Sequence, residues 1–274
     1  MKTQDLNKSS EETNFRLLNC HGSFPFSIKK VNFGKNTTSM SLISQLIEFD
    51  QELLLTLNSH FSAYWDNFFW MFTSKEVWLP LYLTLAYVIF KNHGLKGFVT
   101  LMAIGLLILL CDQISTNIFK EGFERFRPSR DPNLKYLVHL INGKRGGMYG
   151  FVSSHATNSF GLAMFTALLF RNRTFSIGIF LWAVINSYSR IYMGVHYPGD
   201  ILGGLLLGLL LGKFVYEIYL RVITRFMVIS HHNKRLLKSG LAETFKNDAL
   251  MPVFTILLMT GTLLLAAKVI LKMM

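Results

Sequence analysis

Apolar residues gather in long runs along most of this chain, and polar residues fall mainly between the runs. Several runs approach the roughly 20 residues that a helix needs to cross a bilayer, and they carry no charge in the middle. A helix in a soluble core is usually shorter and keeps a polar face. The pattern predicts an all-α fold, a polytopic membrane helix bundle of about six transmembrane helices. The predicted spans are residues 77–90, 97–117, 149–170, 174–193, 199–220 and 251–271.

The segments before the first span have a different pattern. Residues 1–41 are polar, and we expect a disordered tail without the apolar h-region of a cleaved signal peptide. Met40 directly precedes the first patterned segment, which makes it a candidate for the native start. Residues 42–73 mix apolar, acidic and aromatic positions, which favours helices that lie at the membrane interface.

The domain organisation follows from these segments. No repeat or linker divides residues 42–221, so we predict one membrane domain there. Residues 222–249 are interpreted as a cytoplasmic linker, in which His231 and His232 are solvated. Residues 250–274 are predicted to form an extra C-terminal transmembrane helix.

The charge of the chain fits a membrane protein. The formal net charge is +12, and basic residues of membrane proteins gather in cytoplasmic loops. No element for reading nucleic acid accompanies this charge, so we expect no nucleic-acid partner. The two cysteines, Cys20 and Cys111, indicate neither a disulfide framework nor a zinc site.

Lysine and arginine at the span ends indicate the orientation. Alternating spans place the basic residues of 91–96, 171–173 and 221–238 on one side, which we interpret as cytoplasmic. The loop 118–148 then lies outside, although it carries seven basic residues. Those exterior charges require another explanation.

The first motif in this loop pairs two cations. Lys120 and Arg127 are seven residues apart, which places them on one face of a helix that Pro128 would end. A lysine and an arginine together suit a phosphate group. The alternative is a basic helix end held at the lipid headgroups.

The second motif opens the span 149–170. Ser153 and Ser154 are candidate helix caps, and a helix N-terminus is a ready anion site. His155 is placed to donate a proton to a leaving group. The alternative is a simple serine cap beside an interfacial histidine.

The third motif joins two later spans and contains Arg190, His196 and Asp200. A carboxylate four residues from a histidine can hold the ring and make its other nitrogen a better nucleophile. The alternative is that Asp200 only caps a helix and His196 is a turn residue. Counting spans brings all three motifs to one face of the membrane, whatever the absolute orientation.

These residues resemble a known superfamily. The series Lys-x6-Arg-Pro, Ser-Ser-His and Ser-Arg-x5-His-x3-Asp is similar to the motifs of the type 2 phosphatidic acid phosphatases, which vanadium haloperoxidases and glucose-6-phosphatase share. The motifs cover residues 120–200, and the architecture covers about 42–221. Val152 and Ser154 depart from the commoner Pro-Ser-Gly-His of the second motif.

The resemblance implies a role for each matched residue. His196 would attack phosphorus and form a phosphohistidine, Asp200 would hold it, and His155 would protonate the leaving oxygen and then activate water. No metal or cofactor is implied. The phosphoryl oxygens would be bound by Lys120, Arg127, Arg190 and the backbone N–H groups near Ser153 and Ser154.

The resemblance thus implies an integral membrane phosphatase of a lipid phosphomonoester or diphosphate. We expect a bacterial inner membrane, a periplasmic active site, and a substrate such as undecaprenyl diphosphate, phosphatidylglycerophosphate, phosphatidic acid or a lipid A phosphate. A lipid phosphotransferase would use the same residues. A transporter is disfavoured because the charges gather at one face, and a haloperoxidase because that branch is largely soluble. The oligomeric state stays open.

Overall fold

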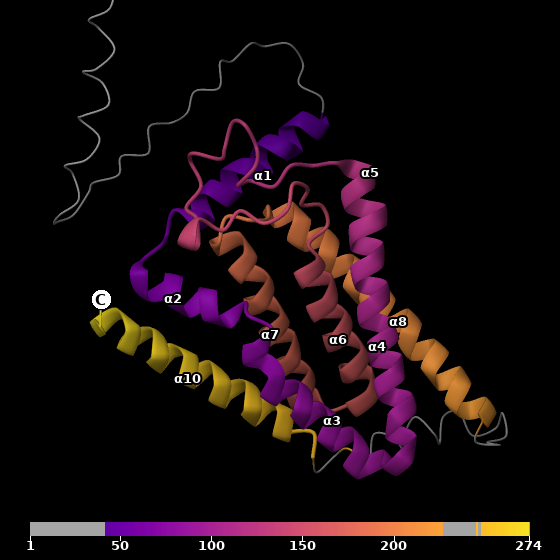
Figure 1. Cartoon of the computed structure of the whole chain (residues 1–274). Helices are drawn as coiled ribbons and strands as arrows, with labels where there is room; N and C mark the ends of the chain where they lie inside the picture. Colours follow the sequence, from indigo (N-terminus) through magenta and orange to yellow (C-terminus); the bar gives the residue numbers. More distant parts are fainter. Residues whose placement is uncertain (1–41, 227–244, 246–247, 274) are drawn as a thin grey trace, which may run out of the picture. The chain divides into compact units, whose positions relative to one another are not determined.

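The computed structural model describes residues 42–226, 245 and 248–273, which form helices and irregular segments without a β-strand (Figure 1). The predicted all-α class is confirmed. The tail 1–41 and the pair His231 and His232 lie outside the described residues. The α-helices are α1 Leu42–Asn58, α2 Ala63–Phe72, α3 Leu79–His93, α4 Gly97–Gln113, α5 Glu121–Phe123, α6 Ser154–Phe170, α7 Arg173–Tyr192, α8 Pro198–Phe226 and α10 Met251–Met273.

Shorter helical segments connect some of these helices. One π-helical segment, η3 at Ile114–Lys120, continues α4 into α5, and such segments often occur at functional sites. The remaining segments are 3₁₀ turns: η1 Glu76–Trp78, η2 Gly94–Lys96 and η4 Ile141–Gly143.

Three continuous helical segments in the described part of the chain are long and apolar enough to cross a membrane: Glu76–Phe123, Pro198–Arg225 and Met251–Met273. The first contains two predicted spans, because only the tight turn η2 separates α3 from α4. The helices α6 and α7 are not in this set. Most of α6 is buried and it has only 17 residues, and α7 carries several polar residues. The number of six spans therefore stays a prediction.

The helices α6 and α8 pack closely along a stripe of glycines. A Cβ atom at Gly204 would lie 2.7 Å from the carbonyl oxygen of Ser153, and one at Gly208 would lie 2.5 Å from that of Thr157. Small residues of this kind let helix backbones approach each other in lipid. The packing brings the first turns of α6 and α8 side by side, and the second and third motifs stand at those turns.

The C-terminal helix α10 belongs to the same bundle. It contacts α2, where the hydroxyl of Tyr64 donates to the carbonyl of Leu264 at 3.2 Å. It also contacts α3, where the hydroxyls of Thr84 and Thr255 are 3.1 Å apart. Helix α8 continues to Phe226, beyond the end that we predicted for its span.

The helix α1 carries exposed apolar side chains, as a helix at the membrane interface requires. Its last residue, Asn58, ties it to the end of α7 and to the outer loop. The side-chain amide of Asn58 donates to the carbonyl of Tyr192 at 2.7 Å, and its oxygen accepts the backbone N–H of His139 at 2.7 Å. These bonds hold α1 close to the loop that carries the first motif.

Candidate active site

The first motif does not lie on one continuous helix, so that part of the prediction is wrong. Helix α5 ends at Phe123, and Glu124 adopts a left-handed conformation with φ of 47°. Beyond it the chain is extended, and the N–H of Arg127 donates to the carbonyl of Met148 at 3.0 Å. Arg127 reaches the site from this extended segment, and Lys120 reaches it from the end of the π-helical segment.

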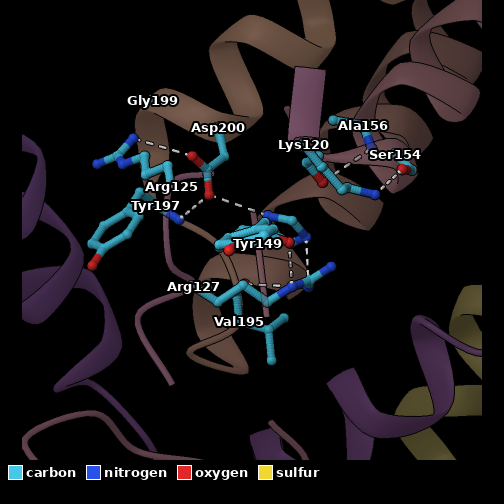
Figure 2. A network of polar contacts seen from close by, with 12 residues as sticks. Lys120, Arg125, Arg127, Tyr149, Ser154, Ala156, Val195, Tyr197, Gly199 and Asp200 are labelled. Carbon is cyan, nitrogen blue, oxygen red and sulfur yellow. Dashed lines mark hydrogen bonds and ion pairs between the residues drawn. The ribbon is translucent and has the colours of Figure 1, made fainter. Parts of the chain in front are cut away.

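The third motif forms a buried histidine–carboxylate pair at the start of α8 (Figure 2). Nδ1 of His196 lies 3.2 Å from Oδ2 of Asp200. The same carboxylate oxygen accepts the backbone N–H of Tyr197 at 3.1 Å. Helix α8 begins at Pro198, so Asp200 stands in its first turn, where a negative charge is favourable.

The other ring nitrogen of His196 faces a cation. A terminal nitrogen of the Arg127 guanidinium lies 2.9 Å from Nε2, and its Nε donates to the carbonyl of Tyr149 at 3.0 Å. A guanidinium can only donate, so Nε2 must be the acceptor and the ring proton must sit on Nδ1, toward Asp200. This tautomer puts the lone pair on Nε2, where it accepts the Arg127 hydrogen bond, and attack requires that this bond be released.

The electrostatic surroundings keep this ring neutral. Burial lowers the pKa of His196 well below its usual range, and the charges of Arg127, Arg190 and Lys120 lower it further. Burial also lowers the pKa of Arg127. A neutral imidazole with a free lone pair is the nucleophilic form of the side chain.

Three cations surround the Nε2 side. Lys120 donates to the hydroxyl of Ser154 at 2.5 Å, and Arg190 donates to the hydroxyl of Thr73 at 2.8 Å. Within the described residues, Nε of Arg190 is buried without a hydrogen-bond partner. None of Lys120, Arg127 and Arg190 forms an ion pair with a carboxylate in the same part of the chain. Such a cluster is suited to bind an anion with several oxygens.

The second motif lies where the sequence placed it, at the start of α6. Ser153 is the N-cap, and its hydroxyl accepts the N–H of Ala156 at 3.5 Å. The N–H of Ser153 donates to the carbonyl of Asp200 at 3.0 Å, so it is already bonded. Helix geometry leaves the N–H groups of Ser154 and His155 for an anion.

His155 stands in the first turn of α6, within electrostatic reach of Arg190, Arg127 and His196. The side chain of Ser154 points to the hydroxyl of Ser115, 2.7 Å away, as well as to Lys120. The hydroxyl that replaces the commoner glycine therefore holds the lysine of the first motif.

Two residues of the site were missed by the sequence reasoning. Arg125 donates to Oδ1 of Asp200 at 3.1 Å and to Oδ2 of Asp50 at 2.7 Å. Asp50 appeared in the sequence only as a polar interruption of α1, and Arg125 as one more basic residue of the outer loop. A carboxylate within an apolar helix was the available signal, but its partner 75 residues away cannot be read from spacing.

Among the described residues, no group of three or more His, Cys, Asp or Glu side chains could hold a metal ion. The chemistry that the site offers is a neutral nucleophilic nitrogen beside a cationic pocket, with a second histidine nearby.

Comparison with known proteins gives a consistent result. A family model described as the PAP2 superfamily matches residues 76–223. The chain is 42% identical over 186 residues to the lipid A 4'-phosphatase of Bacteroides thetaiotaomicron, covering 67% of this chain and 83% of that protein. It is 38% identical over 183 residues to the lipid A 4'-phosphatase of Porphyromonas gingivalis, covering 66% and 78%. A crystal structure of a transmembrane PAP2 type phosphatidylglycerolphosphate phosphatase from Bacillus subtilis is 23% identical, with a TM-score of 0.49, and the match covers 64% of this chain and 86% of that one.

Proposed function

The chain belongs to the PAP2 superfamily and is an integral membrane lipid phosphatase, and we propose that it removes the 4'-phosphate of a lipid A-type glycolipid. The name of the two bacterial relatives supports this choice of substrate, because the chain covers most of the length of both. The coarser activity, hydrolysis of a lipid phosphate, follows from the family.

The single observation that carries the mechanism is the line of contacts from Asp200 through His196 to Arg127. It fixes the tautomer of the imidazole and directs its lone pair toward the cations. In the first step, Nε2 of His196 attacks phosphorus while the bond from phosphorus to the glycolipid oxygen breaks. With the negatively charged phosphate bound beside it, His155 is protonated; it gives this proton to that leaving oxygen, and the product is a phosphohistidine.

In this step the protein must mainly stabilise the negative charge on the oxygens of the transferring phosphoryl group. We assign that task to Lys120, Arg127 and Arg190, with the first-turn N–H groups of Ser154 and His155. Arg127 occupies the position in front of Nε2, so the bound phosphoryl group has to draw its guanidinium away from the ring and onto a phosphoryl oxygen. Nε of Arg190, which has no hydrogen-bond partner among the residues that the structure describes, offers a further donor.

The second step reverses the roles of the two histidines. His155, now neutral, takes a proton from water, and the water oxygen attacks phosphorus as the bond to Nε2 of His196 breaks. Inorganic phosphate leaves, and His196 returns to its neutral state with the proton still on Nδ1, directed toward Asp200. The same carboxylate stabilises the positive charge of the ring while phosphorus is attached.

We place the active site at the periplasmic face. The three motifs stand at the ends of η3, α6 and α8 that lie together, whereas Lys91, Lys96 and Arg173 lie at the opposite ends of α3, α4 and α7. Short basic loops favour the cytoplasm, which puts the motifs outside. A lipid A-type headgroup would then be reached from the outer leaflet of the inner membrane.

Phosphate release from purified lipids tests this function. The full-length protein in detergent with EDTA is given lipid A bisphosphate, undecaprenyl diphosphate, phosphatidylglycerophosphate and phosphatidic acid in parallel. We expect release from lipid A by the wild type, loss of the 4'-phosphate in the product by mass spectrometry, and no release by His196→Ala. His60→Ala is the matched control, because His60 is exposed at the end of α1.

Each other outcome has a defined meaning. Equal release by His196→Ala would overturn the nucleophile. Release from another lipid of the panel, with lipid A untouched, would overturn the substrate but keep the lipid phosphatase. Transfer of labelled phosphate to an acceptor lipid, without free phosphate, would make the protein a phosphotransferase.

A further inference from the structure

Arg125 and Asp50 stand behind the catalytic pair, on the side away from the phosphoryl pocket. We propose that they are positioning residues, which set the geometry of His196 by fixing Asp200; this inference rests on the proposed function. Arg125 occupies an unspecified position inside the first motif, and Asp50 lies outside all three motifs. Arg125 contacts Asp200 directly from the outer loop, and Asp50 acts on it from α1 through Arg125. The proposal follows from the way in which one guanidinium joins two carboxylates.

Arg125 links the two carboxylates through its two terminal nitrogens. One donates to Oδ1 of Asp200 at 3.1 Å, and the other donates to Oδ2 of Asp50 at 2.7 Å. The guanidinium carbon lies 4.0 Å from the centre of the Tyr197 ring, which covers one face of the fork. The rigid fork reaches the two carboxylates from two separate nitrogens, whereas a lysine has only one nitrogen, so a lysine could not replace it fully.

Asp50 fixes the helix turn on which Asp200 stands. Its Oδ1 accepts the backbone N–H of Gly199 at 2.7 Å, in the first turn of α8, where helix geometry leaves the N–H groups unpaired. The approach is close, since a Cβ atom at Gly199 would lie only 2.7 Å from Oδ2 of Asp50. Asp50 thus holds the backbone of this turn directly and the side chain of Asp200 through Arg125.

Asp200 depends on this support because it is fully buried. Its Oδ2 is used by His196 and the N–H of Tyr197, and its Oδ1 is used by Arg125. Among the described residues, Arg125 is the only lysine or arginine that forms an ion pair with Asp200, and the other ring or charged partner of this carboxylate is the neutral imidazole of His196. A buried carboxylate without such a partner is costly, and its position would change with the loss.

Arg125 and Arg127 act on opposite ring nitrogens of His196. They are two residues apart in an extended segment, which places their side chains on the same face of the chain. Arg127 contacts Nε2 directly, and Arg125 acts on Nδ1 through Asp200. Figure 2 shows Arg125 beside Asp200 and Tyr197, with Arg127 at the other end of the network near Val195.

This division predicts a specific kinetic signature. Arg125→Ala should lower kcat by about 10²-fold, since a displacement of about 1 Å at a reacting group costs that much. KM should not change, because Arg125 does not face the phosphoryl pocket. Arg125→Lys should recover part of kcat, and Asp50→Asn should lose less than Arg125→Ala, because an amide oxygen can still accept the N–H of Gly199.

The experiment measures kcat and KM for phosphate release by the full chain in detergent, on the lipid that the wild type hydrolyses. The variants are Arg125→Ala, Arg125→Lys, Asp50→Asn and the double variant Arg125→Ala with Asp50→Asn. Arg130→Ala is the matched control, because Arg130 lies in the same loop. Within the described part of the chain, its side chain donates one hydrogen bond, to the carbonyl of Gly146. The double variant should be no slower than Arg125→Ala alone, because both residues act through Asp200.

Several results would overturn the positioning role. Wild-type kcat in folded Arg125→Ala would do so, and so would a rise in KM that accounts for the whole loss. If Arg125→Ala fails to fold, Asp50→Asn keeps the inference testable, and wild-type kcat in that variant would contradict it. An inactive wild-type protein would instead overturn the proposed function, so the two failures are distinguishable.

Discussion

The two sides of the His196 ring differ in whether their charged groups are paired. On the Nε2 side, Lys120, Arg127 and Arg190 have hydroxyl, carbonyl or ring-nitrogen partners but no carboxylate in the described residues. On the Nδ1 side, Asp200 is bonded through both of its oxygens. The first side lacks a counterion and the second is complete without a ligand. The difference identifies one side as the place for substrate and the other as its support.

The two sides also differ in what they do to the protein itself. Buried cations without carboxylate partners destabilise a fold, and they persist where function requires them. The support side offsets part of this cost through hydrogen bonds that join α1, the outer loop and α8. We therefore expect substitutions on the Nε2 side to affect substrate binding and rate together, and substitutions on the Nδ1 side to affect mainly rate.

The largest effect is expected at Arg190, on the Nε2 side. Arg190→Ala should lower kcat/KM by about 10²- to 10³-fold, the usual cost of removing a donor to the charge of a transition state. Arg190→Lys should recover only part, because the planar fork is lost. Steady-state phosphate release measures both. Arg173→Ala, at the exposed opposite end of α7, is the control, and a loss as large as that of Arg190→Ala would contradict the account.

A smaller effect is expected when the support side is crowded. A Cβ atom at Gly150 would lie 2.9 Å from Oδ2 of Asp200 and 3.6 Å from Nδ1 of His196. Gly150→Ala should therefore displace the pair and lower kcat by up to about 10²-fold. Because the same Cβ atom would lie 3.2 Å from Cγ of Arg127, KM should rise as well. Gly147→Ala is the control, since nothing lies within 4 Å of a Cβ there. Full activity in Gly150→Ala would show that the pair tolerates displacement.

The charge of the Nε2 side should appear in the pH profile. Lys120 contributes to the lowered pKa of His196, so Lys120→Gln should raise that pKa toward its usual value. Because only the neutral ring attacks, the acid limb of kcat/KM should move to higher pH in the variant. The substrate phosphate titrates near pH 6 in both proteins, so the difference between the two profiles belongs to the enzyme. A limb that does not move would exclude this electrostatic role.

The smallest effect is expected at the departure from the family motif. Ser154→Gly restores the commoner residue and removes the hydroxyl that holds Lys120. Lys120 keeps its charge and a second partner in the hydroxyl of Thr116, so we expect the loss of an ordinary hydrogen bond. Such a bond contributes about 0.5–1.5 kcal/mol, which predicts a rise in KM of about 2- to 10-fold. A matched measurement on Ser115→Ala, which removes the other partner of that hydroxyl, should give a smaller rise. Unchanged KM in Ser154→Gly would mean that Lys120 is positioned without the serine.

Much of the fold could be predicted because lipid imposes a simple rule on helix length. Apolar runs predicted α3, α4, α6, α7, α8 and α10 in order. The resemblance based on the three motifs is confirmed by the family match over residues 76–223. The roles of the individual site residues stay a prediction. The structure nonetheless joins Arg127, His196 and Asp200 in one line of contacts. It also brings Lys120 into contact with Ser154.

The parts that sequence reasoning missed depend on tertiary contacts. The helix through Arg127 was wrong because Glu124 adopts a left-handed conformation and the chain then pairs with the segment around Tyr149. Spacing alone gives no sign of that turn. Arg125 and Asp50 come close only because α1 packs against the outer loop, so no local sequence pattern predicts their ion pair.

The most direct test of the central claim is to trap the phosphorylated histidine. His155→Ala is mixed with radiolabelled p-nitrophenyl phosphate, whose leaving group needs no proton, so the first step proceeds while the second lacks its base. We predict that an alkali-stable label accumulates on the peptide that contains His196, and that His196→Ala in the same background takes up none. Turnover without label on His196, or label on another residue, would contradict the account.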